Sequence, residues 1–308
     1  MATGATKNKG TFNSITYVFT AALVFSIHDV MIKWISGTYP VHEIVFIRSV
    51  VGLVPIVLIV RFNGGLGQLK TRKIQDLIIR SLLMFSSYVS FYLSLSALPI
   101  AVSVSLFFSS PIFIFVLSVL FLNESVDKGS WAAVFAGFLG VVIMLNPGAD
   151  VIDPAAFLAV LSALFYAVGA IMTRKLGKTE SGLTQLFYLL VVYLVCSLML
   201  AAVLSQASAG ADVHPSAAFF LRPWQIPPLR DIGLLLSIGL MAALGIYCLT
   251  QAYRLEDPSR VAPFEYIAVP LGAFWGLLLW HDVLDLQSII GIFFIIGSGL
   301  FIIRRKKN

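Results

Sequence analysis

The sequence is poor in charged residues and in cysteine. Only 12% of its 308 residues are Asp, Glu, Lys or Arg, against about 25% in an average soluble domain, and 59% are hydrophobic. Both cysteines, Cys196 and Cys248, lie inside apolar runs, where they indicate neither a disulfide framework nor a metal site. This shortage of charge excludes an ordinary soluble domain and makes lipid the expected solvent for most of the surface.

Motifs for catalysis and for nucleotide binding are also missing from the sequence. It contains no HExxH, no GxSxG, no phosphate-binding loop and no metal-spaced set of histidines or cysteines. We therefore expect no enzyme, no cofactor, no metal and no ATP-driven transport by this chain alone. The net charge is +6, but the sequence contains no cluster of basic residues interleaved with exposed aromatics, so we expect no nucleic-acid partner. A receptor or assembly factor would need a larger soluble part than the 206–230 loop.

Long apolar runs recur along the chain and predict an all-α integral membrane protein of ten transmembrane helices. About 20 apolar residues are needed to cross a hydrocarbon core of ~30 Å. The expected spans are 13–35, 42–60, 74–97, 101–122 and 130–145, then 154–173, 182–205, 231–253, 261–280 and 286–303. Only Leu98-Pro99-Ile100 separates the third span from the fourth, and Pro99 favours a tight turn there. The first span is too long for a cleaved signal peptide.

Lys and Arg divide unevenly between the two sides of these spans. One side would hold Lys7, Lys9, Arg61, Lys70, Arg72, Lys73, Lys128, Arg174, Lys175, Lys178, Arg254, Arg260, Arg304, Arg305, Lys306 and Lys307. The other side would hold only Arg222 and Arg230. Loops rich in Lys and Arg remain on the cytoplasmic side of the membrane. The uneven distribution therefore predicts a multi-pass inner (plasma) membrane protein with both termini cytoplasmic.

The two halves of the sequence are similar to one another. A shift of 159 residues places Pro99 on Pro258, Pro111 on Pro270 and Gly140 on Gly299. We interpret 13–146 and 154–303 as repeats, and an odd number of helices in each makes the second copy inverted. Chance similarity of apolar sequences is the alternative. Inverted repeats recur in secondary transporters, which place the solute near mid-membrane.

A series of short motifs follows the same order in the chain as in a known family. The motifs are FSIHDVMIK, YPVHEIVFIRS with Arg48, ALPIAVSVSLFFSSPIF, LNES with Glu124, AGFLGVVIM, FYAVGAIMTRKL and AYRLEDPSRVAPFEYIAVPLGAFWGLLLW. They resemble the EamA-type members of the drug/metabolite transporter superfamily over nearly the whole chain. His281-Asp282-Val283 departs from the glycine–glutamate pair that members usually carry. The resemblance implies a carrier of amino acids, vitamins, nucleotide-like metabolites or drugs. Export is favoured, and uptake of a vitamin- or nucleoside-like solute is the alternative.

Three charged residues fall inside the first two spans, where charge is costly and needs a partner or a purpose. Asp29 and Lys33 are spaced i, i+4, which places them on one helix face within ion-pair reach. Arg48 lies ~9 Å below the outer end of the second span, at a depth similar to that of Asp29, with His28 beside them. Either these residues form an ion-pair network that joins the two spans, or Arg48 or Asp29 meets the solute or a coupling proton.

Glu265 lies about one turn into the ninth span, before Pro270. Arg254 and Arg260 could reach it, which would give it a structural role. The alternative is a cavity carboxylate that binds a cationic or zwitterionic solute or carries a proton.

Pro111 and Pro270 interrupt the fourth and ninth spans at matching positions. Each removes a backbone donor and frees carbonyls for a solute, with a simple packing kink as the alternative. The predicted binding residues are Glu265, Tyr266, Phe107, Ser110, Arg48, Asp29, Tyr88, Tyr247 and Gln251, and the predicted structural residues are Pro111, Pro270 and Lys33. The expected partners are membrane lipids and a small zwitterionic or cationic amphipathic solute moved by alternating access, with protons as candidate coupling ions. The chain is expected to be a monomer or a homodimer.

Overall fold

The computed structural model describes residues 2–62, 65–122, 127–145, 153–205, 213–281 and 286–305. Within these ranges the chain is helical apart from turns and short connections, and no strand occurs there. Glu124 and Asp282-Val283, which the sequence motifs included, lie outside the described residues. The all-α fold class is confirmed.

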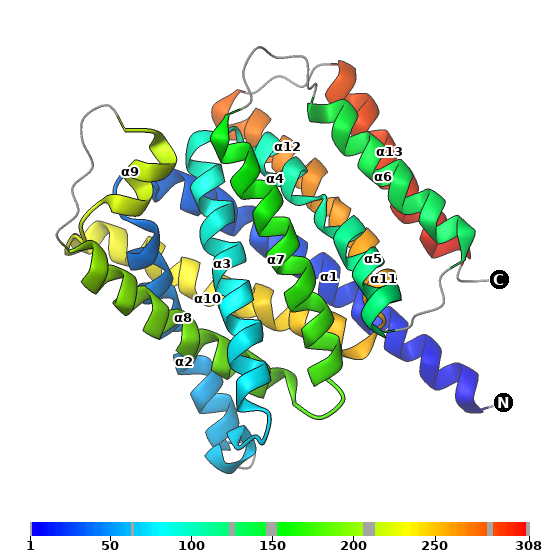
Figure 1. Ribbon diagram of the computed structural model, residues 1–308, viewed down its shortest axis with the longest axis horizontal. Coiled ribbons are helices and arrows are strands. Elements are labelled where there is room, and N and C mark those ends of the chain that lie inside the picture. The colour runs from blue at the N-terminus through cyan, green and yellow to red at the C-terminus, as the bar shows by residue number, and fades with distance from the viewer. Residues whose placement is uncertain are drawn as a thin grey trace.

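The helices follow one another along the chain (Figure 1). They are α1 (Ala2–Ile35), α2 (Val41–Phe62), η1 (Leu66–Leu69), α3 (Ile74–Ala97), α4 (Ile100–Phe107), α5 (Ser110–Leu122), α6 (Lys128–Leu145), α7 (Pro154–Leu176), α8 (Gly182–Leu204), α9 (Pro215–Leu221), α10 (Leu229–Leu255), α11 (Pro258–Val261), η2 (Ala262–Ile267), α12 (Ala268–Trp280) and α13 (Leu286–Arg305). Eight helical stretches in the described chain have the length and apolar composition to cross a membrane.

Local sequence explains where several helices begin. Asp153 precedes α7, and its Oδ1 accepts a hydrogen bond from Ala155 N at 2.7 Å. Ser181 caps α8 in the same way, because its Oγ accepts from Thr184 N at 3.0 Å. Each cap satisfies one of the backbone donors that a helix leaves free at its start. Pro99 is the residue before α4, so the third and fourth spans are separate helices as predicted.

Two of the expected spans are discontinuous. The 101–122 span consists of α4 and α5, which part at residues 108–109. The 261–280 span begins earlier, at α11, and passes through the 3₁₀ segment η2 into α12. A proline removes the hydrogen bond to the carbonyl four residues earlier, and its ring crowds that carbonyl. Pro111 and Pro270 lie in the first turns of α5 and α12, so neither donates to the carbonyl four residues earlier, at Phe107 and Tyr266.

Helices of the first half pack against helices of the second half throughout the bundle. Neighbouring pairs are α3 with α7, α1 with α10, α2 with α8, and α6 with α13, the last pair lying side by side at one edge (Figure 1). Between α3 and α7, Ser87 Oγ donates to Ser162 O at 2.9 Å and Ser162 Oγ donates to Ser87 O at 2.7 Å. Such small polar residues let helices approach closely and join them by hydrogen bonds in lipid.

The short helix α9 was not predicted, and it covers one end of the bundle, which we call the α9 end. Ser216 Oγ donates to Leu93 O of α3 at 2.6 Å, and Arg222 Nη1 donates to Ser36 O after α1 at 2.7 Å. Pattern analysis misses α9 because seven residues are too few to show a helical period. The opposite end of the bundle, near η1, is called the η1 end.

Tyr39, between α1 and α2, joins a further helix to the α9 end. Its Oη donates to Asp231 Oδ2 of α10 at 2.6 Å. Burial, with the hydrogen bond to Asp231 second, raises the pKa of Tyr39 to about 12. The hydroxyl therefore stays protonated at physiological pH, and we expect this contact to persist across the neutral range.

Gly239 allows α10 to approach α2 closely. A Cβ at this position would lie 2.6 Å from Val51 Cβ and 3.2 Å from Arg48 Cα, closer than packed atoms allow. We expect Gly239→Ala to destabilise the protein by about 1–3 kcal/mol, as overpacking does. Gly233 of the same helix, with no atom within 4 Å of its Cβ position, is the matched control. Melting in detergent checks this, and equal midpoints for the two alanine variants would contradict it.

Candidate functional site

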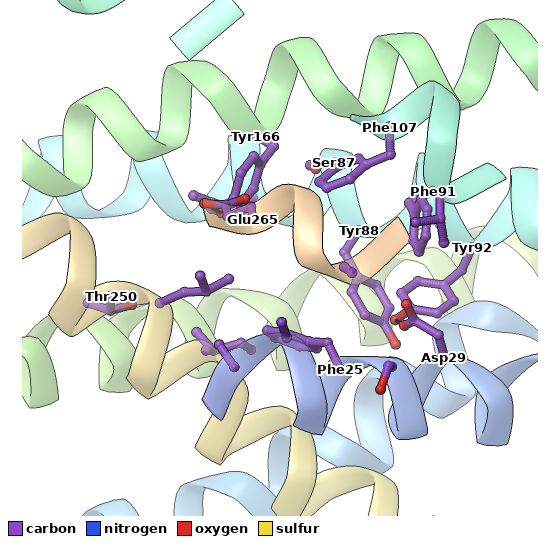
Figure 2. Close-up of a pocket in the computed structure, with 18 of the residues that line it drawn as sticks. Phe25, Asp29, Ser87, Tyr88, Phe91, Tyr92, Phe107, Tyr166, Thr250 and Glu265 are labelled. Atoms are coloured by element: carbon purple, nitrogen blue, oxygen red, sulfur yellow. Dashed lines mark hydrogen bonds between the residues drawn. The ribbon is translucent and has the colours of Figure 1, made fainter. Parts of the chain in front are cut away.

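A cavity of about 180 Å³ lies inside the bundle, among helices of both halves. Its walls are apolar and aromatic, with contributions from Phe25, Phe91, Phe107, Phe108, Tyr88, Tyr92, Tyr166, Tyr193 and Tyr253. Four charged residues also line it: Asp29, Arg48, Arg80 and Glu265. Figure 2 places Glu265 with Tyr166 on one side of the cavity, and Asp29 with Tyr88 and Tyr92 on another. The charges thus form two groups, one toward the η1 end and one toward the α9 end.

Glu265 lies in η2 and is only 6% exposed. Tyr166 Oη lies 3.0 Å from both carboxylate oxygens, and Tyr253 Oη donates to Oε1. Of the two alternatives left open for Glu265, the contacts of the described residues do not support a structural role through Arg254 or Arg260. Arg260 faces Glu256 and Asp257, and Arg254 Nε donates to Glu180 O at 3.3 Å.

Tyrosine hydroxyls are therefore the partners of Glu265, and no ion pair to it exists among the described residues. A buried carboxylate is stable when its oxygens are hydrogen-bonded, but the cavity side keeps a negative charge without a cation. This arrangement can receive a cationic group or a proton.

Arg80 of α3 lies near Glu265's end of the cavity and is 1% exposed. Its Nε donates to Thr173 Oγ1 at 2.6 Å, its Nη1 to Gln185 O at 3.3 Å and its Nη2 to Thr250 Oγ1 at 3.4 Å. These partners belong to α7, α8 and α10, so that one side chain joins four helices. Sequence analysis missed Arg80, although an arginine inside an apolar run is the same signal that singled out Arg48.

Asp29 and Lys33 bind different partners. Asp29 Oδ1 accepts from Tyr92 Oη at 2.5 Å and lies 3.5 Å from His28 Nδ1. Lys33 Nζ donates to the carbonyl oxygen of Leu98 at 2.8 Å, after the end of α3. Lys33 binds there because the free carbonyls at a helix C-terminus attract a cation. These contacts join α1 to α3, and no ion pair between α1 and α2 occurs among the described residues.

Arg48 of α2 points into the cavity from a fully packed position, with 1% of its surface exposed. Its Cζ lies 3.4 Å from the ring centroid of Tyr88 and 5.2 Å from that of Tyr193. Stacking of a guanidinium on an aromatic face is favourable. Nε, Nη1 and Nη2 have no hydrogen-bond partner among the described residues.

The predicted binding residues divide between the cavity and its surroundings. Glu265, Phe107, Arg48, Asp29 and Tyr88 line the cavity. The residues outside its lining are Tyr266, Ser110, Tyr247 and Gln251.

Their contacts explain why these four residues do not line the cavity. Tyr266 packs on Phe108 and close to Gly137 of α6, since the 3₁₀ turn directs it away from its neighbour Glu265. Gln251 Nε2 donates to Tyr247 Oη at 2.9 Å. Ser110 is fully buried in α5, just before Pro111.

Several cavity residues were not predicted as a site. Tyr92, Tyr193 and Tyr253 look like ordinary packing aromatics in the sequence, and only their hydrogen bonds and ring contacts in the fold distinguish them. Pro111, Pro270 and Lys33 lie outside the lining.

A bundle of apolar helices around a buried cavity with charged and aromatic walls is the architecture of a membrane carrier for small molecules. The chain belongs to the EamA-like transporter family, whose model matches residues 13–146 and again 153–304. The family assignment made from the sequence motifs is confirmed.

Named relatives of the chain are transporters of small molecules. It is 30% identical over 286 residues to an S-adenosylmethionine uptake transporter of Rickettsia bellii, covering 92% of this chain and 90% of that protein. It is 28% identical to the pseudopaline exporter CntI of Pseudomonas aeruginosa (94% and 95% covered) and 29% identical to a riboflavin transporter of Vibrio cholerae (95% and 95% covered). A crystal structure with 15% identity superposes with a TM-score of 0.69, covering 96% of this chain and 99% of the other, which shows a shared fold.

Proposed function

We propose that the protein is a secondary transporter that moves a small amphipathic metabolite, zwitterionic or cationic, across the inner membrane by alternating access. The observation that carries this proposal is Glu265, a buried cavity carboxylate whose partners are two tyrosine hydroxyls. An ionised group inside a membrane protein marks a solute or proton path. A cationic group of the solute, or a proton, neutralises the negative charge of Glu265.

The cavity walls support a solute with a flat, apolar part. Phe91 and Phe107 pack with ring centroids 5.1 Å apart, and Phe107 lies 5.2 Å from Tyr166. Aromatic rings favour such ring contacts. S-adenosylmethionine and riboflavin, which relatives carry, both contain a flat ring system. The family resemblance favours export, and uptake is the second candidate because S-adenosylmethionine relatives at up to 30% identity are uptake transporters.

Alternating access is supported by the relation between the halves. We propose that 13–146 and 154–303 are inverted five-helix repeats and that α6 and α13 are the fifth and tenth spans. The family model matches each half separately, and the helix interruptions at α4–α5 and η2–α12 fall at corresponding places. Discontinuous helices of this kind build solute sites at repeat interfaces.

The proposed topology places both termini in the cytoplasm. We expect green fluorescent protein fused after Asn308 to fluoresce, because it folds in the cytoplasm. Alkaline phosphatase inserted within residues 206–212 should be active, because it folds only on the outer side of the membrane. Alkaline phosphatase inserted after Lys178 should be inactive. Activity at position 178 with none at 206–212 would reverse the assigned orientation.

Transport is tested with purified protein in proteoliposomes. Each of S-adenosylmethionine, riboflavin and L-tryptophan is loaded inside, and exchange against the radiolabelled solute outside is measured. We expect exchange of at least one solute above protein-free vesicles and above vesicles with the Glu265→Gln variant. Absence of exchange for every solute, in protein that melts cooperatively, would count against the proposal.

A further inference from the structure

Arg48 carries a buried positive charge and forms no ion pair within the part of the chain that the structure describes. Its three guanidinium nitrogens have no hydrogen-bond partner among the described residues. Leaving a buried donor unpaired costs about 1–3 kcal/mol, and more when the group is charged. A group outside the protein's own side chains is the natural partner for these donors.

Asp29 is a carboxylate that lines the same cavity, but its partners are other side chains than Arg48. It accepts from Tyr92 at 2.5 Å and faces His28, and it lies beyond 4.0 Å from every nitrogen of Arg48. His28 is itself fully buried, between Asp29, Tyr92 and Phe25. The aromatic groups that face Arg48 are Tyr88 and Tyr193, whose rings hold the guanidinium and offer no negative charge.

The stacking fixes the plane of the guanidinium. Tyr88 lies 3.4 Å from Arg48 Cζ, and its own ring is held by Tyr92 at a centroid distance of 4.1 Å. A planar guanidinium presents its donors along its edge, in a fork that matches the two oxygens of a carboxylate. Because the stack holds the plane before a solute arrives, little side-chain freedom is lost on binding.

We propose that Arg48 is the anchor for a carboxylate of the transported solute. The carboxylate binds at the α9 end of the cavity, the apolar body of the solute lies along Phe91 and Phe107, and a cationic group, where present, faces Glu265. This inference deepens the proposed transport function and rests on it, but it concerns binding at one residue.

The test uses three probes that share an indole ring: L-tryptophan, indole-3-propionate and tryptamine. S-adenosylmethionine and its decarboxylated analogue form a second matched pair. A ligand that binds only the folded state raises the melting midpoint. We expect the carboxylate-bearing probes to raise the midpoint of the wild type, and to bind Arg48→Gln roughly 10- to 100-fold more weakly, as loss of a hydrogen bond to a charged group predicts. Probes without a carboxylate should shift both proteins equally.

Arg48→Lys keeps the charge but loses the fork and the planar stack, and we expect it to fall between the wild type and Arg48→Gln. It carries the test if Arg48→Gln does not fold. Arg72→Gln, at an exposed arginine near the η1 end, is the matched control and should bind every probe as the wild type does. The anchor is overturned if carboxylates bind Arg48→Gln as tightly as the wild type, or if no carboxylate shifts the wild-type midpoint. A wild type that binds carboxylates through Arg48 but exchanges no solute would instead overturn the transport proposal alone.

Discussion

Glu265→Gln should abolish solute movement while the protein stays folded. The amide has the shape of the carboxylate and can still accept from Tyr166 and Tyr253, so the packing of η2 is kept. It lacks the negative charge, and removing one partner of a buried charge pair costs roughly 3–5 kcal/mol, or at least about 100-fold in rate. Initial exchange rates in proteoliposomes measure the effect, and the melting midpoint reports folding.

Two further variants separate charge from position. Tyr253→Phe removes one hydroxyl from Glu265 Oε1 and should weaken transport less than Glu265→Gln does. Glu180→Gln is the matched control, because Glu180 accepts from Thr71 at 2.8 Å outside the cavity. If Glu265 carries a proton, the residual exchange by Glu265→Gln should no longer vary with pH. Wild-type kinetics and pH dependence in that variant would remove Glu265 from the transport mechanism.

The helix ends could largely be predicted because lipid constrains them strongly. Exposed backbone is too costly in hydrocarbon, so apolar length and breaks define helices, and the predicted 74–97 helix agrees with α3 at both ends. The direction in which each side chain points could not be predicted as well. In an apolar helix the lipid face and the packed face have similar composition, and Tyr266 and Tyr247 were therefore assigned to a cavity that they do not line.

The charged residues of the cavity could be predicted from the sequence, but the tyrosines that bind them could not. Glu265, Arg48 and Asp29 were found because charge in a membrane span is unusual. Their partners were not, since Tyr166 and Tyr253 reach Glu265 from other helices and Tyr92 reaches Asp29 from α3. The 3₁₀ segment η2, which carries Glu265, was not predicted, because six residues are too few to show a period.

Arg80→Met should stop transport without lowering the melting midpoint. The three hydrogen bonds of Arg80 contribute about 1.5–3 kcal/mol each, but burying an ionised group costs several kcal/mol, so the two nearly balance. Methionine fills the space of the aliphatic stem and carries no charge to desolvate. Because Arg80 adds little to stability, we expect it to serve transport. Its partners on α7, α8 and α10 indicate that it links helices that move relative to one another.

Arg80 holds four helices together at the η1 end of the cavity through neutral oxygen acceptors, which water can replace when the helices separate. An apolar side chain at this position would leave these three acceptors without the donor that joins them. We expect Arg80→Met to reduce exchange at least about 100-fold, Arg80→Lys to recover part of it, and Arg72→Met to behave as wild type. A large fall in melting midpoint together with normal exchange per folded molecule would show that Arg80 serves the fold and not the movement of solute.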